Sequence, residues 1–145
     1  MAFHHEWRHL LLHACARYSL ASPTYTLMPD HMHLLWLGLQ ENGSDQRIAM
    51  EFLRKQLRPH LAPAVWQPQS YDHVLREHER ERGAFQAAAQ YVLENPVRAG
   101  LASRWQTYPY VGCCIPGYPD LTPRTPDYWD RFWRCYNYLV DRRCS

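Results

Sequence analysis

The sequence predicts an α+β protein in which several helices pack on a small sheet. Residues 3–18, 45–58 and 84–95 carry apolar side chains every three or four positions, which is typical of amphipathic helices. Between the first two, two histidines are followed by an apolar run at residues 34–39, as expected for a buried strand. The chain has 145 residues, of which 46% are hydrophobic, so it can bury one core and is not disordered.

The first helix and the turns after it follow from local patterns. Residues 3–18 place an apolar stripe on one side: Phe3, Trp7, Leu10, Leu11, Ala14 and Tyr18. Proline cannot donate to a sheet ladder. We therefore expect a break at Ser22-Pro23 and a bend at Met28-Pro29-Asp30 between two short strands.

The strand that follows carries two histidines one residue apart. Side chains alternate along a strand, so His31 and His33 share one face with Leu35. The other face points into the core and carries Met32, Leu34 and Trp36. Imidazoles on one face can share a cation because their ring nitrogens can converge. Taken alone, the pattern fits a metal site and a sheet face that happens to carry histidines equally well.

The second predicted helix has a basic outer side. Ser44 is a suitable N-cap, and Pro59 with Pro63 is expected to end the helix. The outward-facing basic residues are Arg47, Arg54, Lys55 and Arg58. Such a side is usually only solvated, but it is also a candidate track for DNA.

The second half of the chain contains one extended segment and two helices. Residues 64–75 are expected to be extended, with a hairpin around residues 67–70. The helix at 84–95 carries Tyr91. After a proline-rich stretch, residues 128–140 predict a final aromatic helix. We divide the chain into a main domain, residues 1–110, and a segment, residues 111–145, whose helix packs on it.

Three groups of residues together resemble the REP-associated single-tyrosine transposases, a branch of the HUH endonuclease superfamily. The first is Met-Pro-Asp-His-Met-His-Leu-Leu at 28–35. The second is Val-Trp-Gln at 65–67 with Tyr-Asp-His-Val-Leu-Arg at 71–76. The third is Tyr-Val-Leu-Glu-Asn-Pro-Val-Arg-Ala-Gly-Leu at 91–101. The resemblance extends from about Trp7 to about Tyr110.

This resemblance implies a ferredoxin-like fold with an antiparallel sheet, and a specific chemistry. In the family, a metal held by the two histidines and a third polar ligand polarises a phosphate of single-stranded DNA. A tyrosine attacks and leaves a 5′-phosphotyrosine and a 3′-hydroxyl, and attack by a 3′-hydroxyl reverses the link. Transferred to this chain, Tyr91 is the nucleophile, His31 and His33 are metal ligands, and Mg²⁺ or Mn²⁺ is the cofactor. Single-stranded or hairpin DNA is the expected partner.

The residue types suit that chemistry. A tyrosine hydroxyl is protonated at neutral pH and must be activated before it can attack. Asn95 lies four residues after Tyr91, on the same helical face, and is the favoured third ligand. An asparagine at this place can equally be a helix C-cap. Arg98 is a candidate for holding a phosphate, and a plain salt bridge is the alternative.

The chain departs from the family at its N-terminal side. The family has a strand before the first helix, centrally beside the histidine strand, whereas this chain starts almost directly in a helix. A missing strand would expose ladder groups unless another segment or a second chain fills the gap. A second hypothesis is therefore a truncated or domesticated relative that binds DNA hairpins without cleaving them. A third is an unrelated metal hydrolase that uses His31, His33 and Asp72.

Composition adds limited information on partners and location. The net charge is +2, and the basic residues are fifteen arginines and Lys55. Arginine suits phosphate contacts, although a GC-rich genome gives the same bias. The five cysteines include no Cys-x-x-Cys pair, so we expect reduced thiols. With no signal peptide and no membrane-length apolar run, we expect a bacterial cytoplasmic protein, monomer or homodimer, with no membrane partner.

Overall fold

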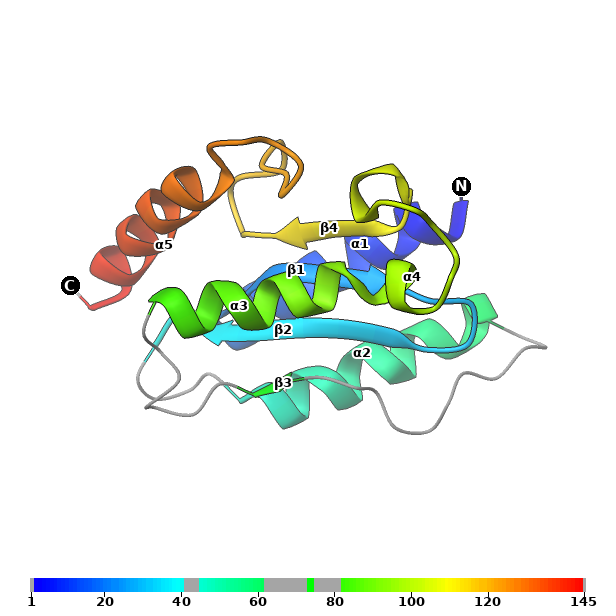
Figure 1. Ribbon diagram of the computed structural model, residues 1–145. Coiled ribbons are helices and arrows are strands. Elements are labelled where there is room, and N and C mark those ends of the chain that lie inside the picture. The colour runs from blue at the N-terminus through cyan, green and yellow to red at the C-terminus, as the bar shows by residue number, and fades with distance from the viewer. Residues whose placement is uncertain (1, 41–44, 62–72, 75–81, 145) are drawn as a thin grey trace.

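The computed structural model describes residues 2–40, 45–61, 73–74 and 82–144. It has an α+β fold in which an antiparallel sheet carries helices on both faces (Figure 1). The elements in chain order are α1 (Ala2–Tyr18), β1 (Leu20–Leu27), β2 (Met32–Gly38), α2 (Gln46–Leu61), β3 (His73–Val74), α3 (Arg82–Leu93), α4 (Asn95–Arg98), the 3₁₀ helix η2 (Trp105–Thr107), β4 (Val111–Cys114) and α5 (Tyr128–Cys144). The predicted fold class is confirmed, including the C-terminal aromatic helix.

The sheet has the order β3-β2-β1-β4. β1 is central and pairs antiparallel with both β2 and β4. β4 comes from the segment after residue 110 and was not predicted. On the other side of β2, β3 pairs in parallel at two positions, Leu35 with His73 and Trp36 with Val74. β3 therefore lies beside the histidine strand, on the side away from β1. Most of the expected extended segment, including its hairpin and Asp72, lies outside the described residues.

Proline 23 does not end a strand, contrary to expectation. β1 continues from Leu20 to Leu27 with all its residues buried. The register shifts between Ala21 and Tyr25 in the ladder with β2, and between Ser22 and Tyr25 in the ladder with β4. The proline therefore lies at an irregularity in both ladders. A bulge removes the need for a ladder N–H, which lets proline sit in a central strand. The second bend is as predicted, since the Met28 N–H donates to the His31 carbonyl across Pro29-Asp30 at 2.8 Å.

The two faces of the sheet bury separate cores, as the predicted alternation requires. Met32, Leu34 and Trp36 pack with α1 and α2. Leu35 and Leu37 face the opposite way and pack with α3 and α5. His33 shares the second face, because it alternates with Met32 and Leu34. The histidine pair and α3 therefore lie on the same side of the sheet.

Two helices differ from their predicted ends. α2 runs through Pro59 to Leu61, because the proline falls in the last turn, where little helix remains to be disrupted. The helix predicted at 84–95 is divided into α3 and the single turn α4, with Glu94 between them. Among the described residues, no helix is both long and apolar enough to cross a membrane.

Candidate active site

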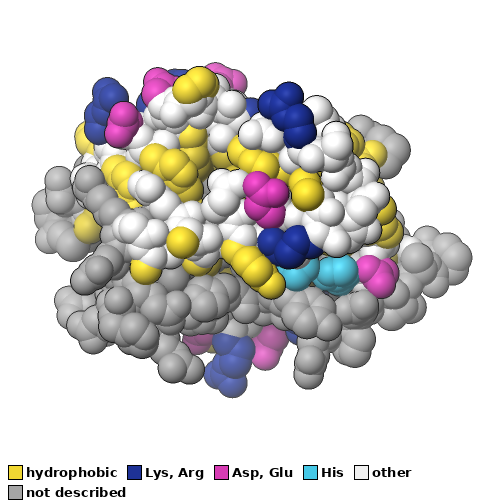
Figure 2. All heavy atoms as spheres, viewed as in Figure 1, with side chains coloured by type: hydrophobic (Ala, Val, Ile, Leu, Met, Phe, Trp, Pro, Cys, Tyr) yellow, Lys and Arg dark blue, Asp and Glu magenta, His cyan; other side chains and the backbone are white. Residues whose placement is uncertain are grey.

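The two histidines meet at the start of β2. The Nε2 atoms of His31 and His33 are 2.9 Å apart, and the ring centroids are 4.7 Å apart. On its other side, Nδ1 of His31 contacts the Asp30 carboxylate at 2.6 Å. Both rings are partly exposed, and Figure 2 shows histidine side chains at the surface with a basic side chain beside them. The carboxylate orients one imidazole so that its second nitrogen faces its neighbour.

Two threonines of β1 fasten α3 over this end of the sheet. The Thr24 hydroxyl donates to the Ala89 carbonyl at 3.3 Å, and the Thr26 hydroxyl donates to the Val92 carbonyl at 2.8 Å. Thr26 is the ladder partner of His33, and partners in a ladder point to the same face. The last turn of α3 is thus held by the residue beside His33, and Figure 1 shows this turn and α4 over the β1–β2 bend.

Tyr91 lies on that last turn and is 63% exposed. The guanidinium carbon of Arg98 lies 3.7 Å from the centre of its ring. Nη2 of Arg98 also donates to the Tyr91 carbonyl at 2.7 Å. Within the described part of the chain, the Tyr91 hydroxyl makes no hydrogen bond. The ring is therefore held while its hydroxyl stays open to solvent.

The Asn-Pro-Val-Arg-Ala-Gly sequence builds a compact helical turn. Pro96 sits in the first turn of α4, where its missing N–H costs nothing. Gly100 has φ +75°, and its N–H donates to the Val97 carbonyl while the Leu101 N–H donates to the Pro96 carbonyl. This is a Schellman ending, which favours glycine at the left-handed position. The turn puts Asn95 and Arg98 on one side, three residues apart.

Asn95 is buried, at 9% exposure, and both ends of its amide are in use. Its Nδ2 donates to the Val92 carbonyl at 3.0 Å, and its Oδ1 accepts from Nη2 of Arg98 at 2.7 Å. The first bond caps α3, which is the alternative role considered for this residue. A carbonyl oxygen has a second lone pair, so the cap does not occupy the whole acceptor. The role of Asn95 as a ligand stays a prediction.

The Nε2 atoms of His31 and His33 lie within hydrogen-bond distance of each other, at 2.9 Å. Nitrogens bound at about 2.1 Å and at right angles on one octahedral ion lie about 3.0 Å apart. The observed distance is therefore that of a hydrogen bond between the rings, and it is also close to the spacing of two ligands on one cation. Imidazole ligands favour Mn²⁺ over Mg²⁺. Among the described residues, no group of three or more His, Cys, Asp or Glu side chains is placed to hold a metal. A third ligand drawn from these residues would be of another type, such as the Asn95 amide.

The basic residues of α2 lie elsewhere. Lys55 and Arg58 are exposed and Arg54 is partly buried. α2 packs on the sheet face opposite α3, so the structure does not bring these residues together with Tyr91. Arg98 is the predicted DNA-binding residue that the fold places beside the tyrosine.

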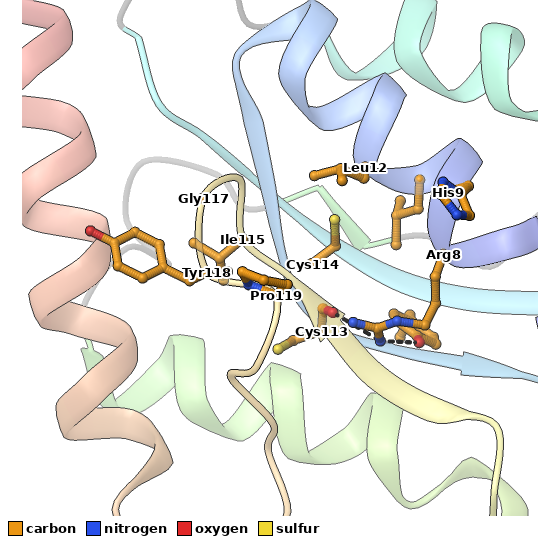
Figure 3. Close-up of a pocket in the computed structure, with 11 residues that line it drawn as sticks. Arg8, His9, Leu12, Cys113, Cys114, Ile115, Gly117, Tyr118 and Pro119 are labelled. Carbon is orange, nitrogen blue, oxygen red and sulfur yellow. Dashed lines mark hydrogen bonds between the residues drawn. The ribbon is translucent and has the colours of Figure 1, made fainter. Parts of the chain in front are cut away.

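A cavity of about 340 Å³ lies on the other side of the sheet, between α1 and β4 (Figure 3). Arg8 crosses it and donates to the Tyr25 hydroxyl at 2.8 Å and to the Cys113 carbonyl at 3.4 Å. Burial, helped by the positive charge of Arg8, lowers the pKa of His4 to about 4. The neutral His4 ring can then accept the Tyr25 proton across 2.8 Å. These polar groups satisfy one another and join α1 to the sheet, so their role is structural.

Comparison with known proteins gives one informative relative. Over 120 residues, the chain is 23% identical to a Haemophilus influenzae protein named as a REP-associated tyrosine transposase. The match covers 72% of this chain and 65% of that relative. The similarity is distant, and the match spans less than two thirds of that relative's length. No family model matches the chain. No solved structure gives a significant match.

Sequence reasoning missed the residues that position the site. Thr24 and Thr26 stand in a fully buried strand, and nothing local shows that their hydroxyls meet α3. Tyr108, whose hydroxyl donates to the Leu27 carbonyl at 2.6 Å, fixes the end of β1 from a distant loop. Buried polar residues require partners, which was the available signal, but the partner cannot be read from the sequence.

Proposed function

We propose that this protein cleaves single-stranded DNA and transfers the strand through a 5′-phosphotyrosine on Tyr91. One observation carries the proposal: the exposed tyrosine lies on the helix turn that Thr26 fastens beside His33. A potential nucleophile and a potential cation site thereby share one end of one sheet face. The distant tyrosine transposase relative supports the same class.

In the proposed reaction, Tyr91 Oη forms a bond to phosphorus and the bond from phosphorus to the 3′-oxygen breaks. The phenolic proton passes to solvent and the departing oxygen becomes a 3′-hydroxyl. A 3′-hydroxyl then attacks the phosphotyrosine and returns the tyrosine, so the number of phosphodiester bonds is unchanged. The open position of the Tyr91 hydroxyl suits attack on a bulky polymer.

His31, His33 and Asn95 would hold the divalent cation, Mg²⁺ or Mn²⁺. When bound, such a cation withdraws charge from the phosphate oxygens and fixes the phosphorus for in-line attack. The protein's own contribution is placement. The Asp30 contact orients His31, and the cap on α3 fixes Asn95.

The proposed DNA partner is a single strand or a hairpin. Arg98 would contact a phosphate next to Tyr91, since guanidinium groups bind phosphate in bidentate fashion. The α2 residues Arg54, Lys55 and Arg58 lie on the opposite face, so they would contact DNA only where it extends past the sheet.

A second candidate is hairpin binding without cleavage. It uses the same surface, with Arg98 beside the exposed Tyr91, and needs no cation on the histidines.

Covalent capture tests both candidates. Hairpin oligonucleotides labelled at their 3′ ends are incubated with protein and Mn²⁺ or Mg²⁺, and the products are separated on a denaturing gel. We expect a protein-linked label that requires the cation, His31 and Tyr91. Tight hairpin binding without any linked label, from protein shown to be folded, would support the binding-only candidate. A label that persists in Tyr91→Phe would exclude Tyr91 as the nucleophile.

A further inference from the structure

Arg98 contacts both Tyr91, the proposed nucleophile, and Asn95, the proposed third metal ligand. A single nitrogen, Nη2, donates to the Tyr91 carbonyl and to Asn95 Oδ1, each at 2.7 Å. The same guanidinium covers the Tyr91 ring at 3.7 Å. In this arrangement one cationic side chain touches both the proposed nucleophile and the proposed third ligand.

A divalent cation on Asn95 would lie close to that guanidinium. Oxygen ligands hold Mg²⁺ or Mn²⁺ at about 2.0–2.3 Å. Added to the 2.7 Å from Oδ1 to Nη2, this puts the cation no more than about 5 Å from Nη2 of the charged guanidinium. Charges of the same sign at this distance repel appreciably even near water. Arg98 in its observed position therefore opposes binding of the cation.

A DNA phosphate bound to Arg98 would remove its unfavourable effect on cation binding. Nη1 and Nε of Arg98 have no hydrogen bond to any residue that the structure describes, so they are available to an incoming anion. A phosphate contacts guanidinium through paired charge-assisted hydrogen bonds. It would neutralise the guanidinium or draw it away from Asn95.

We infer that Arg98 is a positioning residue that keeps the site closed to the cation until a DNA phosphate engages it. The inference rests on the proposed function of the site and adds its regulation. Cation and DNA then bind cooperatively, each increasing affinity for the other. Without DNA, the site stays largely unloaded and Tyr91 stays packed under the guanidinium.

A purely structural role is the competing explanation. Basic side chains often bind the last carbonyls of a helix, and Arg98 does so at Tyr91. In that case, loss of Arg98 would loosen the end of α3 and weaken any cation site that includes Asn95. The two explanations predict opposite changes in cation affinity.

The test is Mn²⁺ affinity, measured by electron paramagnetic resonance on folded protein without DNA. We expect Arg98→Gln to bind Mn²⁺ about tenfold more tightly than the unsubstituted protein. Arg104→Gln is the matched control, because it removes an equal charge from an exposed residue of the same region. Arg104→Gln should change the Mn²⁺ affinity by less than about twofold, because solvent and salt screen the charge of an exposed residue. The inference is overturned if Arg98→Gln binds Mn²⁺ no more tightly than Arg104→Gln.

A double substitution locates the effect on Asn95. We expect Asn95→Ala to weaken Mn²⁺ binding and to abolish the gain from Arg98→Gln. If the gain persists without Asn95, the opposition does not act through this residue and the inference fails. Circular dichroism on each variant establishes that the helices are retained.

The last experiment measures how DNA changes the Mn²⁺ affinity. It uses a Tyr91→Phe background, in which no covalent product forms. A single-stranded oligonucleotide should tighten Mn²⁺ binding by a larger factor when Arg98 is present than in Arg98→Gln. Equal factors would overturn the inference. The covalent product is measured separately, in protein that retains Tyr91. If Arg98→Gln binds Mn²⁺ more tightly but Tyr91 gives no covalent product with any DNA, the inference on Arg98 stands and the proposed reaction fails. If a covalent product forms but Arg98→Gln leaves the Mn²⁺ affinity unchanged, the proposed reaction stands and the inference on Arg98 fails.

Discussion

Two arginine–tyrosine pairs lie on opposite faces of the sheet and are built differently. In the first, Tyr25 is fully buried and Arg8 donates to its hydroxyl. In the second, Tyr91 is 63% exposed and Arg98 covers its ring rather than its hydroxyl. The first pair thus connects α1 to the sheet, whereas the second leaves the Tyr91 hydroxyl accessible to solvent.

Burial sets the properties of the Tyr25 hydroxyl. It raises the pKa of Tyr25 to about 12, although the neighbouring Arg8 acts in the opposite direction. Its hydroxyl is held by Arg8 and His4, and a Cβ on Gly112 would come within 2.6 Å of the oxygen. The Tyr25 side chain is fully buried, whereas that of Tyr91 is exposed to solvent.

Removing each hydroxyl in turn gives the largest expected contrast. Tyr91→Phe should abolish the covalent DNA product and change the free energy of unfolding by less than about 0.5 kcal/mol, because the site is exposed. Tyr25→Phe should retain the product and lower the free energy of unfolding by about 1–3 kcal/mol, since Arg8 and His4 lose their shared partner. Gel capture and urea denaturation measure the two quantities.

The control for this pair is Tyr18→Phe. Tyr18 lies at the end of α1 and contacts Phe52 and Arg17 through its ring, which phenylalanine retains, so the substitution should affect neither quantity. The prediction would be contradicted if Tyr25→Phe gave no covalent product at a temperature where it remains folded. Arg8 and Tyr25 would then take part in function.

Gly112 tests how closely the molecule packs around Tyr25 and Arg8. In Gly112→Ala the added methyl would meet the Tyr25 oxygen at 2.6 Å and Arg8 Nη1 at 3.0 Å. Overpacking of this kind costs about 1–3 kcal/mol, which urea denaturation would show as a lower midpoint.

Gly83 is the matched control for Gly112. A Cβ at Gly83 meets nothing within 4 Å, and the residue lies in α3. Gly83→Ala should therefore stabilise the protein by about 0.5–1 kcal/mol. If both substitutions shifted the midpoint in the same direction, the close packing around Tyr25 would not be what limits position 112.

Local patterns predicted the parts of this molecule that depend on neighbours in sequence. The alternation of Met32, His33 and Leu34 gave the faces of β2, and helical spacing gave α1 and α5. The spacing of Asn95 and Arg98 likewise anticipates that they share one side of a turn. Such features are set by backbone periodicity, which a single sequence contains.

Long-range pairing could not be predicted in the same way. β4 is short and lies among prolines, and it is a strand because β1 offers a free ladder beside it. Pro23 stays within β1 because the surrounding ladders accommodate a bulge. The hydrogen bond from Thr26 to α3 spans 66 residues, and sequence spacing gives no sign of it.

The smallest expected effect is the pH dependence that His4 adds to the buried pair. Burial, with smaller contributions from Arg8, the N-terminus and Arg124, lowers its pKa from 6.5 to about 4 in the folded chain. The unfolded chain therefore binds this proton first as the pH falls. The contribution of His4 to stability is complete above pH 6.5 and is lost progressively toward pH 4.

We expect the loss to reach about 1 kcal/mol by pH 4.5, less than the full shift implies because His4 is only half-buried. Urea denaturation from pH 7.0 to pH 4.5 measures it as the difference between the unsubstituted protein and His4→Gln, which cancels the titration of shared carboxylates. His5→Gln, at an exposed neighbour, should retain the full pH dependence. Parallel curves for the unsubstituted protein and His4→Gln would show that Tyr25 holds Arg8 without help from His4.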